Sequence, residues 1–292
     1  MTSIEGTKTF DHLPPQAPLK TPEGQAYGQR VLQRSRAVLA SHPSLLDRSY
    51  GADYYQKVDV FLPASRVSSP VPILVFAHGG SWIAGYKEWM AFMAPAVTAL
   101  PAVFVSVSYR LAPVNTLTDL VDDCAAAIAW VYAHSGEFAA DRSRLFVGGH
   151  SAGGHLMSLA ALRPDLLTVL GLPHGVVKGC LAVSTPFDLR LPDPAWSSNL
   201  ALLQAVTAGP VDTAAVSPLA HVTSDAPPFL IAIGENDFPV IRQHGVRMRD
   251  TLAEANVPTA FLDLAAHDHF ATSERIVEPG HPWLREAAKI LH

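Results

Sequence analysis

A serine flanked by glycines stands where a strand pattern changes into a helix pattern. Residues 149–153 (Gly-His-Ser-Ala-Gly) fit the G-x-S-x-G spacing of a nucleophilic serine, with an apolar run before them and a helical pattern, residues 152–162, after them. Small residues on both sides of the serine let the strand and the helix approach, and the turn raises the hydroxyl above the sheet. The spacing therefore predicts Ser151 as a nucleophile at a helix N-terminus, whose partial positive charge faces the reaction centre.

A pair of glycines follows another buried strand pattern, in residues 78–82 (His-Gly-Gly-Ser-Trp). Glycines at a strand end allow backbone N–H groups to turn toward a ligand. In acyl transfer such donors stabilise the developing oxyanion, together with the N–H of the residue after the nucleophile. We therefore expect an oxyanion hole formed by Gly80, Ser81 and Ala152, and a structural role for His78 in pinning this loop.

Two carboxylates, Glu235 and Asp237, follow the apolar run of residues 229–233. A carboxylate at this place can accept the Nδ1–H of a histidine, which fixes the tautomer of the ring and stabilises the imidazolium. We favour Asp237 as the acid, because it lies deeper in the loop and just before the helix that begins near residue 240.

Two histidines, His267 and His269, follow the last strand pattern, residues 259–264. Of the 13 histidines, these two follow both the candidate acid and a last strand closely, so one of them should be the general base. Residues two apart in an extended loop point the same way, so spacing alone does not separate them. Asp268 is interpreted as a loop residue, because neighbouring residues rarely orient as a His–Asp pair.

Short runs rich in Val, Ile, Leu and Phe alternate along the chain with longer helical patterns. Strands that are apolar on both faces and alternate with helices indicate an α/β fold with a mostly parallel sheet covered on both sides. Ligands bind such sheets outside the carboxyl ends of the strands, where the candidate residues lie. The predicted strands are residues 54–62 (antiparallel and half-exposed), 71–77, 102–109, 145–147, 176–183, 229–233 and 259–264, and the predicted helices are residues 25–41, 88–100, 117–134, 152–162, 240–255 and 282–291.

No linker divides the chain, so we expect a single domain over residues 1–292. Residues 1–50 are expected to form an N-terminal arm, irregular at first because it is rich in Pro, Thr and Gln, and then a helix. Residues 186–215 interrupt the alternation of strands and helices with Trp196 and several leucines. This segment predicts a small helical cap over the carboxyl edge of the sheet.

Composition excludes several classes of partner. The chain has 292 residues, 49% of them hydrophobic, and a net charge of −5 without a basic block, which argues against nucleic acid. Its apolar runs are too short to span a bilayer, and its start lacks a signal-peptide pattern.

Cys124 and Cys180 lie in apolar segments as expected for buried free thiols, which fits a reducing cytoplasm. We expect a cytoplasmic protein that acts on a small molecule, and a homodimer is compatible with the sequence.

The motifs together resemble the α/β-hydrolase superfamily, in the branch of hormone-sensitive-lipase-like carboxylesterases and kynurenine formamidase-like arylformamidases. The order of serine, acid and histidine is that of this superfamily. The resemblance implies about eight strands with a small helical cap, and a serine hydrolase that needs no cofactor and no metal. The carrying segments are residues 78–82, 109–113 (Tyr-Arg-Leu-Ala-Pro), 149–154, Asp237 and 268–270 (Asp-His-Phe), within a span of about residues 59–269.

Two details of the resemblance bear on the site. Residues 268–270 match a family segment whose histidine completes the triad, which implies His269 rather than His267 as the base. Ser81 stands where hormone-sensitive-lipase-like esterases usually have a third glycine, and the H-G-G-x-W form is closer to the arylformamidases. The resemblance therefore implies a small ester as substrate or, alternatively, an N-formyl or other aryl amide.

The aromatic side chains near these motifs are candidates for an apolar substrate pocket, although core packing explains each of them equally well. They are Trp82, Phe187, Trp196 and Phe238. A catalytically silent binding protein on the same fold is the alternative of another class, and it is disfavoured because serine, acid and histidine are all present. A dehalogenase or epoxide hydrolase would need an aspartate at position 151, and no further ligand cluster or nucleotide fingerprint supports a metal or nucleotide site.

Overall fold

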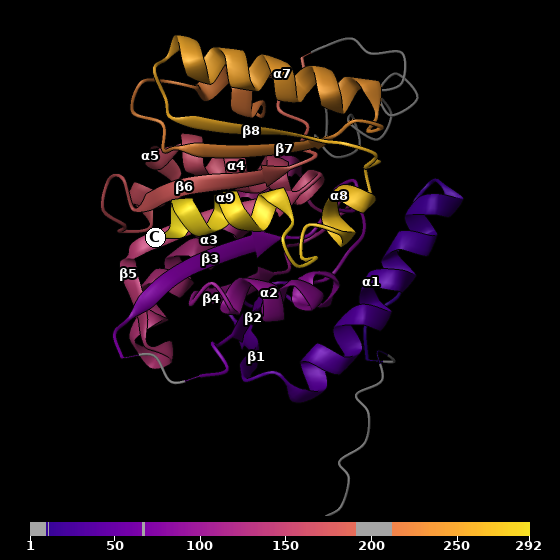
Figure 1. Ribbon diagram of the computed structural model, residues 1–292, viewed down its shortest axis with the longest axis vertical. Coiled ribbons are helices and arrows are strands. Elements are labelled where there is room, and N and C mark those ends of the chain that lie inside the picture. Colours follow the sequence, from indigo (N-terminus) through magenta and orange to yellow (C-terminus); the bar gives the residue numbers. More distant parts are fainter. Residues whose placement is uncertain (1–9, 11, 66–67, 191–211) are drawn as a thin grey trace, which may run out of the picture.

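Eight strands form one sheet in the order β1-β2-β4-β3-β5-β6-β7-β8 (Figure 1). The computed structural model describes residue 10 and residues 12–65, 68–190 and 212–292. The first two strands run antiparallel to their neighbours, and all pairs from β4 to β8 are parallel, which confirms the predicted α/β-hydrolase fold class. The strands are β1 (Ser44–Ser49), β2 (Lys57–Phe61), β3 (Val71–Ala77), β4 (Val103–Val107), β5 (Ala140–His150), β6 (Val177–Val183), β7 (Phe229–Gly234) and β8 (Thr259–Leu264).

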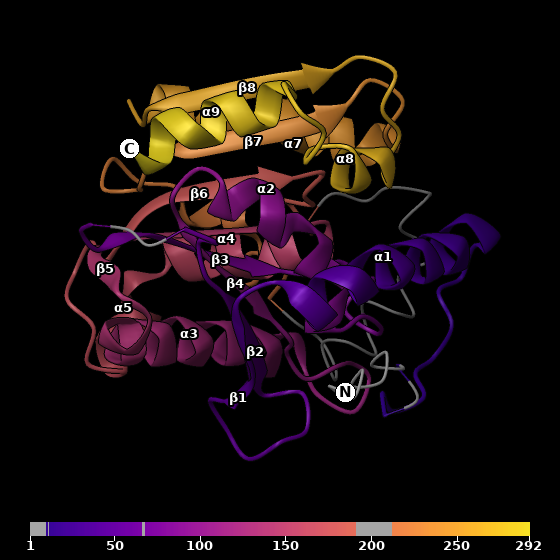
Figure 2. The ribbon, with the colours of Figure 1, turned by 60° about the horizontal axis from the view of Figure 1, so that its bottom comes forward.

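Helices cover both faces of the sheet. In Figure 2, α3, α4 and α5 lie on one side of the sheet, and α2 and α9 lie on the other. Among the described residues, none of the helices is long and apolar enough to cross a membrane. The helices are α1 (Pro22–Ser41), η1 (Lys87–Met93), α2 (Ala94–Thr98), α3 (Leu117–His134), η2 (Ser135–Phe138), α4 (Ala152–Leu162), α5 (Pro164–Val169), η3 (Pro218–His221), α7 (Pro239–Glu254), α8 (Ala271–Glu274) and α9 (Pro282–Leu291).

The central strand β3 shows why its sequence is apolar throughout. Ile73 and Val75 belong to the core cluster shared with α3, α4 and α7, whereas Leu74 and Phe76 belong to the cluster shared with α1, α2 and α9. Successive side chains of a strand point to opposite faces, and both faces of this strand are buried. Two packed layers therefore hold the carboxyl ends of the parallel strands rigidly in place.

The structure differs from the predicted elements in several places. The strand predicted as half-exposed at residues 54–62 is the shorter β2, in which residues 58–61 are all buried, and the short helix α5 was not predicted. Strand β1 was not predicted, because its polarity pattern is broken by a register shift between Leu45 and Arg48, where Asp47 adopts a φ of 56°. The helix predicted at residues 88–100 is a 3-10 helix, η1, followed by the short α2, which has Pro95 in its first turn. Proline lacks the N–H that would continue the preceding helix. The predicted cap at residues 186–215 falls largely outside the described residues.

Candidate active site

Ser151 lies in a sharp turn between β5 and α4. Its backbone has φ 52° and ψ −120°, and its N–H donates to the carbonyl of Val183 on β6. A Cβ atom on Gly149 would lie 2.4 Å from the backbone of Gly153, and one on Gly153 would lie 2.3 Å from the carbonyl oxygen of Ala77. Only glycine fits at either position, so the G-x-S-x-G spacing follows from how closely strand and helix pack. The turn stores local strain, which is typical of functional sites.

Ser151, His269 and Asp237 form a continuous hydrogen-bonded chain. Nε2 of His269 lies 3.0 Å from Oγ of Ser151, and Nδ1 of His269 lies 2.8 Å from Oδ1 of Asp237. A carboxylate only accepts, so Nδ1 carries the proton and Nε2 presents its lone pair to the hydroxyl. The side chain of Asp237 is fully buried and that of His269 is 8% exposed. This is the arrangement in which an imidazole can take a proton from a serine.

Asp237 has further donors around its carboxylate. Oγ of Ser184, which follows β6, donates to Oδ2 at 2.5 Å, and the N–H of Phe238 donates to Oδ1 at 2.7 Å. Burial alone would raise the pKa of Asp237, but the hydrogen bonds from His269, Ser184 and Phe238 and the charge of His269 lower it below its usual value. Asp237 therefore remains ionised.

Sequence reasoning missed Ser184 and its neighbour Thr272. The two hydroxyl oxygens lie 2.7 Å apart, and Thr272 also donates to the carbonyl oxygen of His269 at 2.7 Å. Ser184 comes directly after a buried strand, as do the other polar residues of the site. Its position at a carboxyl strand end was the available signal.

The competing candidates lie in other contacts. His267 contacts the carbonyl of Ala265 through Nδ1 at 2.8 Å, and its Nε2 lies 3.4 Å from Nε2 of His281. Glu235 accepts the N–H of Ala266 at 2.8 Å. Asp268 accepts the N–H groups of Phe270 and Ala271 at the start of α8. Each of these side chains stabilises the loops around His269.

The loop after β3 approaches the serine closely. A Cβ atom on Gly79 would lie 3.2 Å from Cβ of Ser151. Gly80, Ser81 and Trp82 have φ values of 128°, 52° and 61°, and the carbonyl of Gly80 accepts the N–H groups of Ile83 and Ala84. Three successive residues with positive φ make a strained turn whose amide groups differ in direction from those of a strand. The residue before this turn, Gly79, lies next to Ser151.

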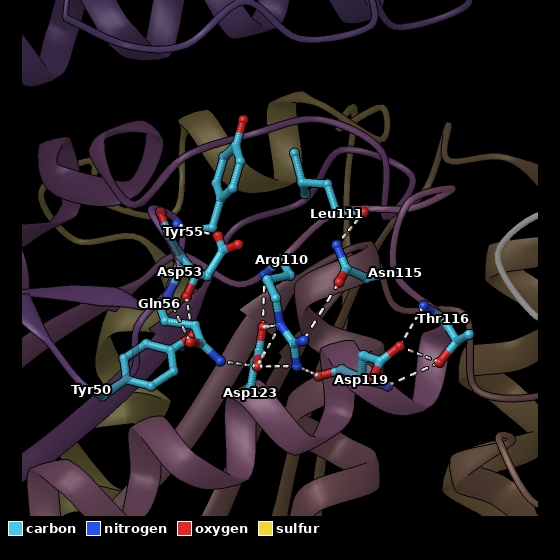
Figure 3. Close-up of polar contacts among 11 residues, drawn as sticks. Tyr50, Asp53, Tyr55, Gln56, Arg110, Leu111, Asn115, Thr116, Asp119 and Asp123 are labelled. Carbon is cyan, nitrogen blue, oxygen red and sulfur yellow. Dashed lines mark hydrogen bonds and ion pairs between the residues drawn. The ribbon is translucent and has the colours of Figure 1, made fainter.

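Contacts from residues 109–113 hold the same turn. The hydroxyl of Tyr109 donates to the carbonyl of His78, and its ring stacks on that imidazole at 4.3 Å. The N–H of Ala112 donates to the carbonyl of Trp82. Arg110 fixes this segment to α3, because its Nε and Nη2 both contact the buried carboxylate of Asp123 (Figure 3). The Tyr-Arg-Leu-Ala-Pro motif thus has a structural explanation as the support of the loop after β3.

The N-terminal arm also contacts this region. The amide of Gln16 donates to the carbonyl of Gly85 at 2.8 Å and accepts its N–H at 2.7 Å. This part of the arm is therefore folded against the segment that follows the loop.

The aromatic pocket candidates have different surroundings. Phe238 is 48% exposed, and its ring lies 4.7 Å from that of His269. Trp82 and Phe187 are buried, Trp82 edge-to-face with His155 and Phe187 within the core. Trp196 lies outside the described residues. Phe238 is thus an exposed aromatic side chain beside the catalytic candidates, and the pocket role of all four residues stays a prediction.

Comparison with known proteins finds relatives that are named as hydrolases. Residues 58–252 match the BD-FAE family. The chain belongs to the BD-FAE family. Kynurenine formamidase of Danio rerio is 30% identical over 251 residues, which cover 84% of this chain and 80% of that protein. The probable carboxylic ester hydrolase LipM of Mycobacterium tuberculosis is 32% identical over 221 residues.

The match with LipM covers 71% of this chain but 51% of the mycobacterial protein, so the chain spans about half the length of that relative. Solved structures agree on the fold. The carboxylesterase EstE1 from a metagenomic library superposes with a TM-score of 0.73 at 20% identity, covering 92% of this chain and 97% of the other. The esterase LipW of Mycobacterium marinum superposes with a TM-score of 0.75 at 21% identity, covering 93% and 91%.

Proposed function

We propose that this protein is a serine hydrolase that cleaves a small ester or an activated aryl or N-formyl amide through an acyl-enzyme. The single observation that carries the proposal is the hydrogen-bonded chain from Ser151 through His269 to Asp237. A catalytically silent binding protein of this fold would not need a strained serine in contact with a basic nitrogen.

The proposed reaction begins when Nε2 of His269 takes the proton of Ser151. Oγ of Ser151 then bonds to the substrate carbonyl carbon, and the carbonyl oxygen becomes an oxyanion. His269 next gives its proton to the leaving alcohol or amine, and the bond from the carbonyl carbon to the leaving group breaks. Water, deprotonated by the same imidazole, then attacks the acyl carbon. The bond from that carbon to Oγ breaks, the imidazolium returns its proton to Ser151, and the acid leaves.

Two groups of residues support these steps. The ionised carboxylate of Asp237 holds the tautomer of His269 and stabilises the imidazolium that forms. The backbone N–H groups of Gly80, Ser81 and Ala152 are the proposed oxyanion donors, and the loss of one such donor typically costs about 3–4 kcal/mol of transition-state stabilisation. The positive φ values of the loop and the position of Ala152 at the start of α4 support this assignment.

A hydrolysis panel tests the proposal and separates its two substrate classes. It compares p-nitrophenyl esters of increasing acyl length with N-formyl and N-acetyl anilines. We expect turnover of at least one class by the wild-type protein and none by Ser151→Ala. Preferred cleavage of formyl anilides would assign the amide class, since relatives carry names of both kinds. Equal turnover by the serine variant would overturn the mechanism.

We also propose a cytoplasmic location and a homodimer. Cys124 and Cys180 are free and buried, which suits a reducing compartment. Strand β8 is the last strand of the sheet, and most of its side chains are half-buried, so a second copy could cover it. Light scattering of the purified protein tests the dimer, and a monomer at micromolar concentration would refute it.

A further inference from the structure

His150, the residue before the nucleophile, contacts three segments of the site at once. It is 1% exposed and ends β5. Its Nε2 lies 2.9 Å from the backbone carbonyl oxygen of His269. Its Nδ1 would lie 2.8 Å from a Cβ atom on Gly79, so the ring also packs against the loop after β3. One imidazole therefore touches the backbone of the proposed base and the proposed oxyanion loop, and it is covalently next to Ser151.

The hydrogen bond to His269 defines the state of the His150 ring. A carbonyl oxygen only accepts, so Nε2 of His150 carries the proton and donates it. Nδ1 then carries no proton, and it has no hydrogen-bond partner within the described part of the chain. Burial and the charge of His269 lower the pKa of His150 to about 3. The ring is consequently neutral at the pH at which a histidine base operates.

The carbonyl of His269 is held from two sides. His150 donates from β5, and Oγ1 of Thr272 donates from α8 at 2.7 Å. The imidazole rings of His150 and His269 lie 4.9 Å apart. The ring of Tyr27 on α1 lies 5.7 Å from the ring of His150 and 5.1 Å from that of Phe270. The backbone of His269 thus has little freedom to shift relative to Ser151.

We propose that His150 is a positioning residue, which uses its Nε2–H to hold the backbone of His269 at the distance from Ser151 that proton transfer needs. The inference rests on the proposed function, since it assigns a role toward the general base. It explains why a polar side chain is buried beside the serine, where an apolar one would fill the space equally well. Small displacements of a catalytic group can reduce a rate by about two orders of magnitude.

Three substitutions separate a donor from mere bulk. His150→Gln places an amide N–H near the position of Nε2, His150→Asn keeps an amide that is too short to reach the carbonyl, and His150→Leu fills space without a donor. We expect kcat to fall about 10- to 100-fold in the Asn and Leu variants, with KM changed less than about threefold, and to be largely restored in the Gln variant. The downfield proton resonance of the His269–Asp237 hydrogen bond should shift or broaden in the Asn and Leu variants alone.

His42→Leu is the matched control. It also removes a histidine whose Nε2 lies 3.0 Å from a backbone carbonyl, that of Leu62, away from the site. It should lower the melting temperature and leave kcat unchanged. If the Asn and Leu variants turn over substrate as fast as the wild type, or if kcat in the series follows melting temperature rather than the presence of a donor at Nε2, the positioning role is refuted. Absence of turnover and of serine labelling in the wild-type protein would instead refute the proposed function.

Discussion

Two carboxylates, Asp237 and Asp59, are buried to the same degree but have different partners. Asp59 contacts an ammonium group, whereas Asp237 contacts an imidazole and a hydroxyl group. The side chain of Asp237 is 0% exposed and that of Asp59 is 1% exposed. Asp59, on β2, contacts the ammonium of Lys87 at 3.0 Å, and the same ammonium contacts Glu88 at 2.6 Å. Asp237 accepts from an imidazole and from the hydroxyl of Ser184.

The two clusters differ in whether a proton can still be transferred to the partner of the carboxylate. Lys87 already neutralises Asp59, and the pKa of Lys87 is raised by the carboxylates although burial alone would lower it. The imidazole beside Asp237 holds one proton and can accept a second from Ser151, so the carboxylate stabilises a charge that appears only during reaction. Burial and a shifted pKa are thus common to both clusters, and a proton acceptor facing a nucleophile distinguishes the proposed active site.

The largest expected effect comes from the histidine loop. His269→Ala should lower kcat by about 10⁵-fold or more, because it removes the only base in contact with Ser151 among the described residues. His267→Ala is the control and should change kcat by less than about threefold, since its ring pairs with His281. Steady-state kinetics on one ester measures both, and a more damaging His267 variant would reverse the assignment.

The next effect separates the two carboxylate clusters. Asp237→Asn should lower kcat by about 10⁴-fold with little change in KM, because the amide favours the wrong tautomer of His269. Asp59→Asn and Glu235→Gln are the matched controls and should leave kcat within about threefold of the wild type. A larger loss of kcat in Glu235→Gln than in Asp237→Asn would show that the acid is misassigned.

The Lys87 cluster should respond in stability instead of rate. Lys87→Met leaves Asp59 and Glu88 buried without their cation, so the free energy of unfolding should fall by about 3–5 kcal/mol while kcat is preserved. Lys289→Met removes an ammonium that is 69% exposed from an ion pair with Glu286, and should cost less than about 1 kcal/mol. Urea denaturation compares the two, and equal losses would contradict the contrast.

Acid should destabilise the fold through its buried histidines. Burial lowers the pKa of His78, His150 and His155 to about 4, 3 and 4, so the unfolded chain binds more protons below pH 6.5. Stability is then complete above pH 6.5 and falls toward pH 4 by about 1.4 kcal/mol per pH unit for each histidine. Burial raises the pKa of Asp59 to about 6, which opposes this trend with one group against three. Urea midpoints between pH 7 and pH 4.5 measure the slope, and a flat profile would contradict it.

The sequence predicted the parallel part of the fold well, because buried strands such as β3 are apolar on both faces and alternate with helices. It failed at β1, where the strand is an exposed edge and a register shift breaks the alternation of polarity. It also failed in residues 88–100. Hydrophobic periodicity indicates a helix there, but it does not distinguish a 3-10 helix from an α-helix.

For the site, the sequence named Ser151, Asp237 and His269, and the structure brings their side chains into hydrogen-bond contact. The choice of His269 came from family resemblance, since spacing leaves both histidines open. Ser184, Thr272 and the contact of His150 with His269 were not predicted. The contacts of Ser184 with Asp237 and with Thr272, and that of His150 with His269, join residues 53 to 119 positions apart in the chain. Such pairings depend on how the loops fold over the sheet.

The most direct test of the account is covalent labelling of the serine. The wild-type protein is treated with a fluorophosphonate, its intact mass is measured over time, and residual ester or anilide hydrolysis is followed in parallel. We expect one added phosphonyl group per chain, located by peptide mapping on Ser151, and loss of activity in proportion to labelling. His269→Ala should label far more slowly than His267→Ala. Hydrolysis that continues after Ser151 is fully labelled, or a label on another residue that abolishes activity, would contradict the proposed mechanism.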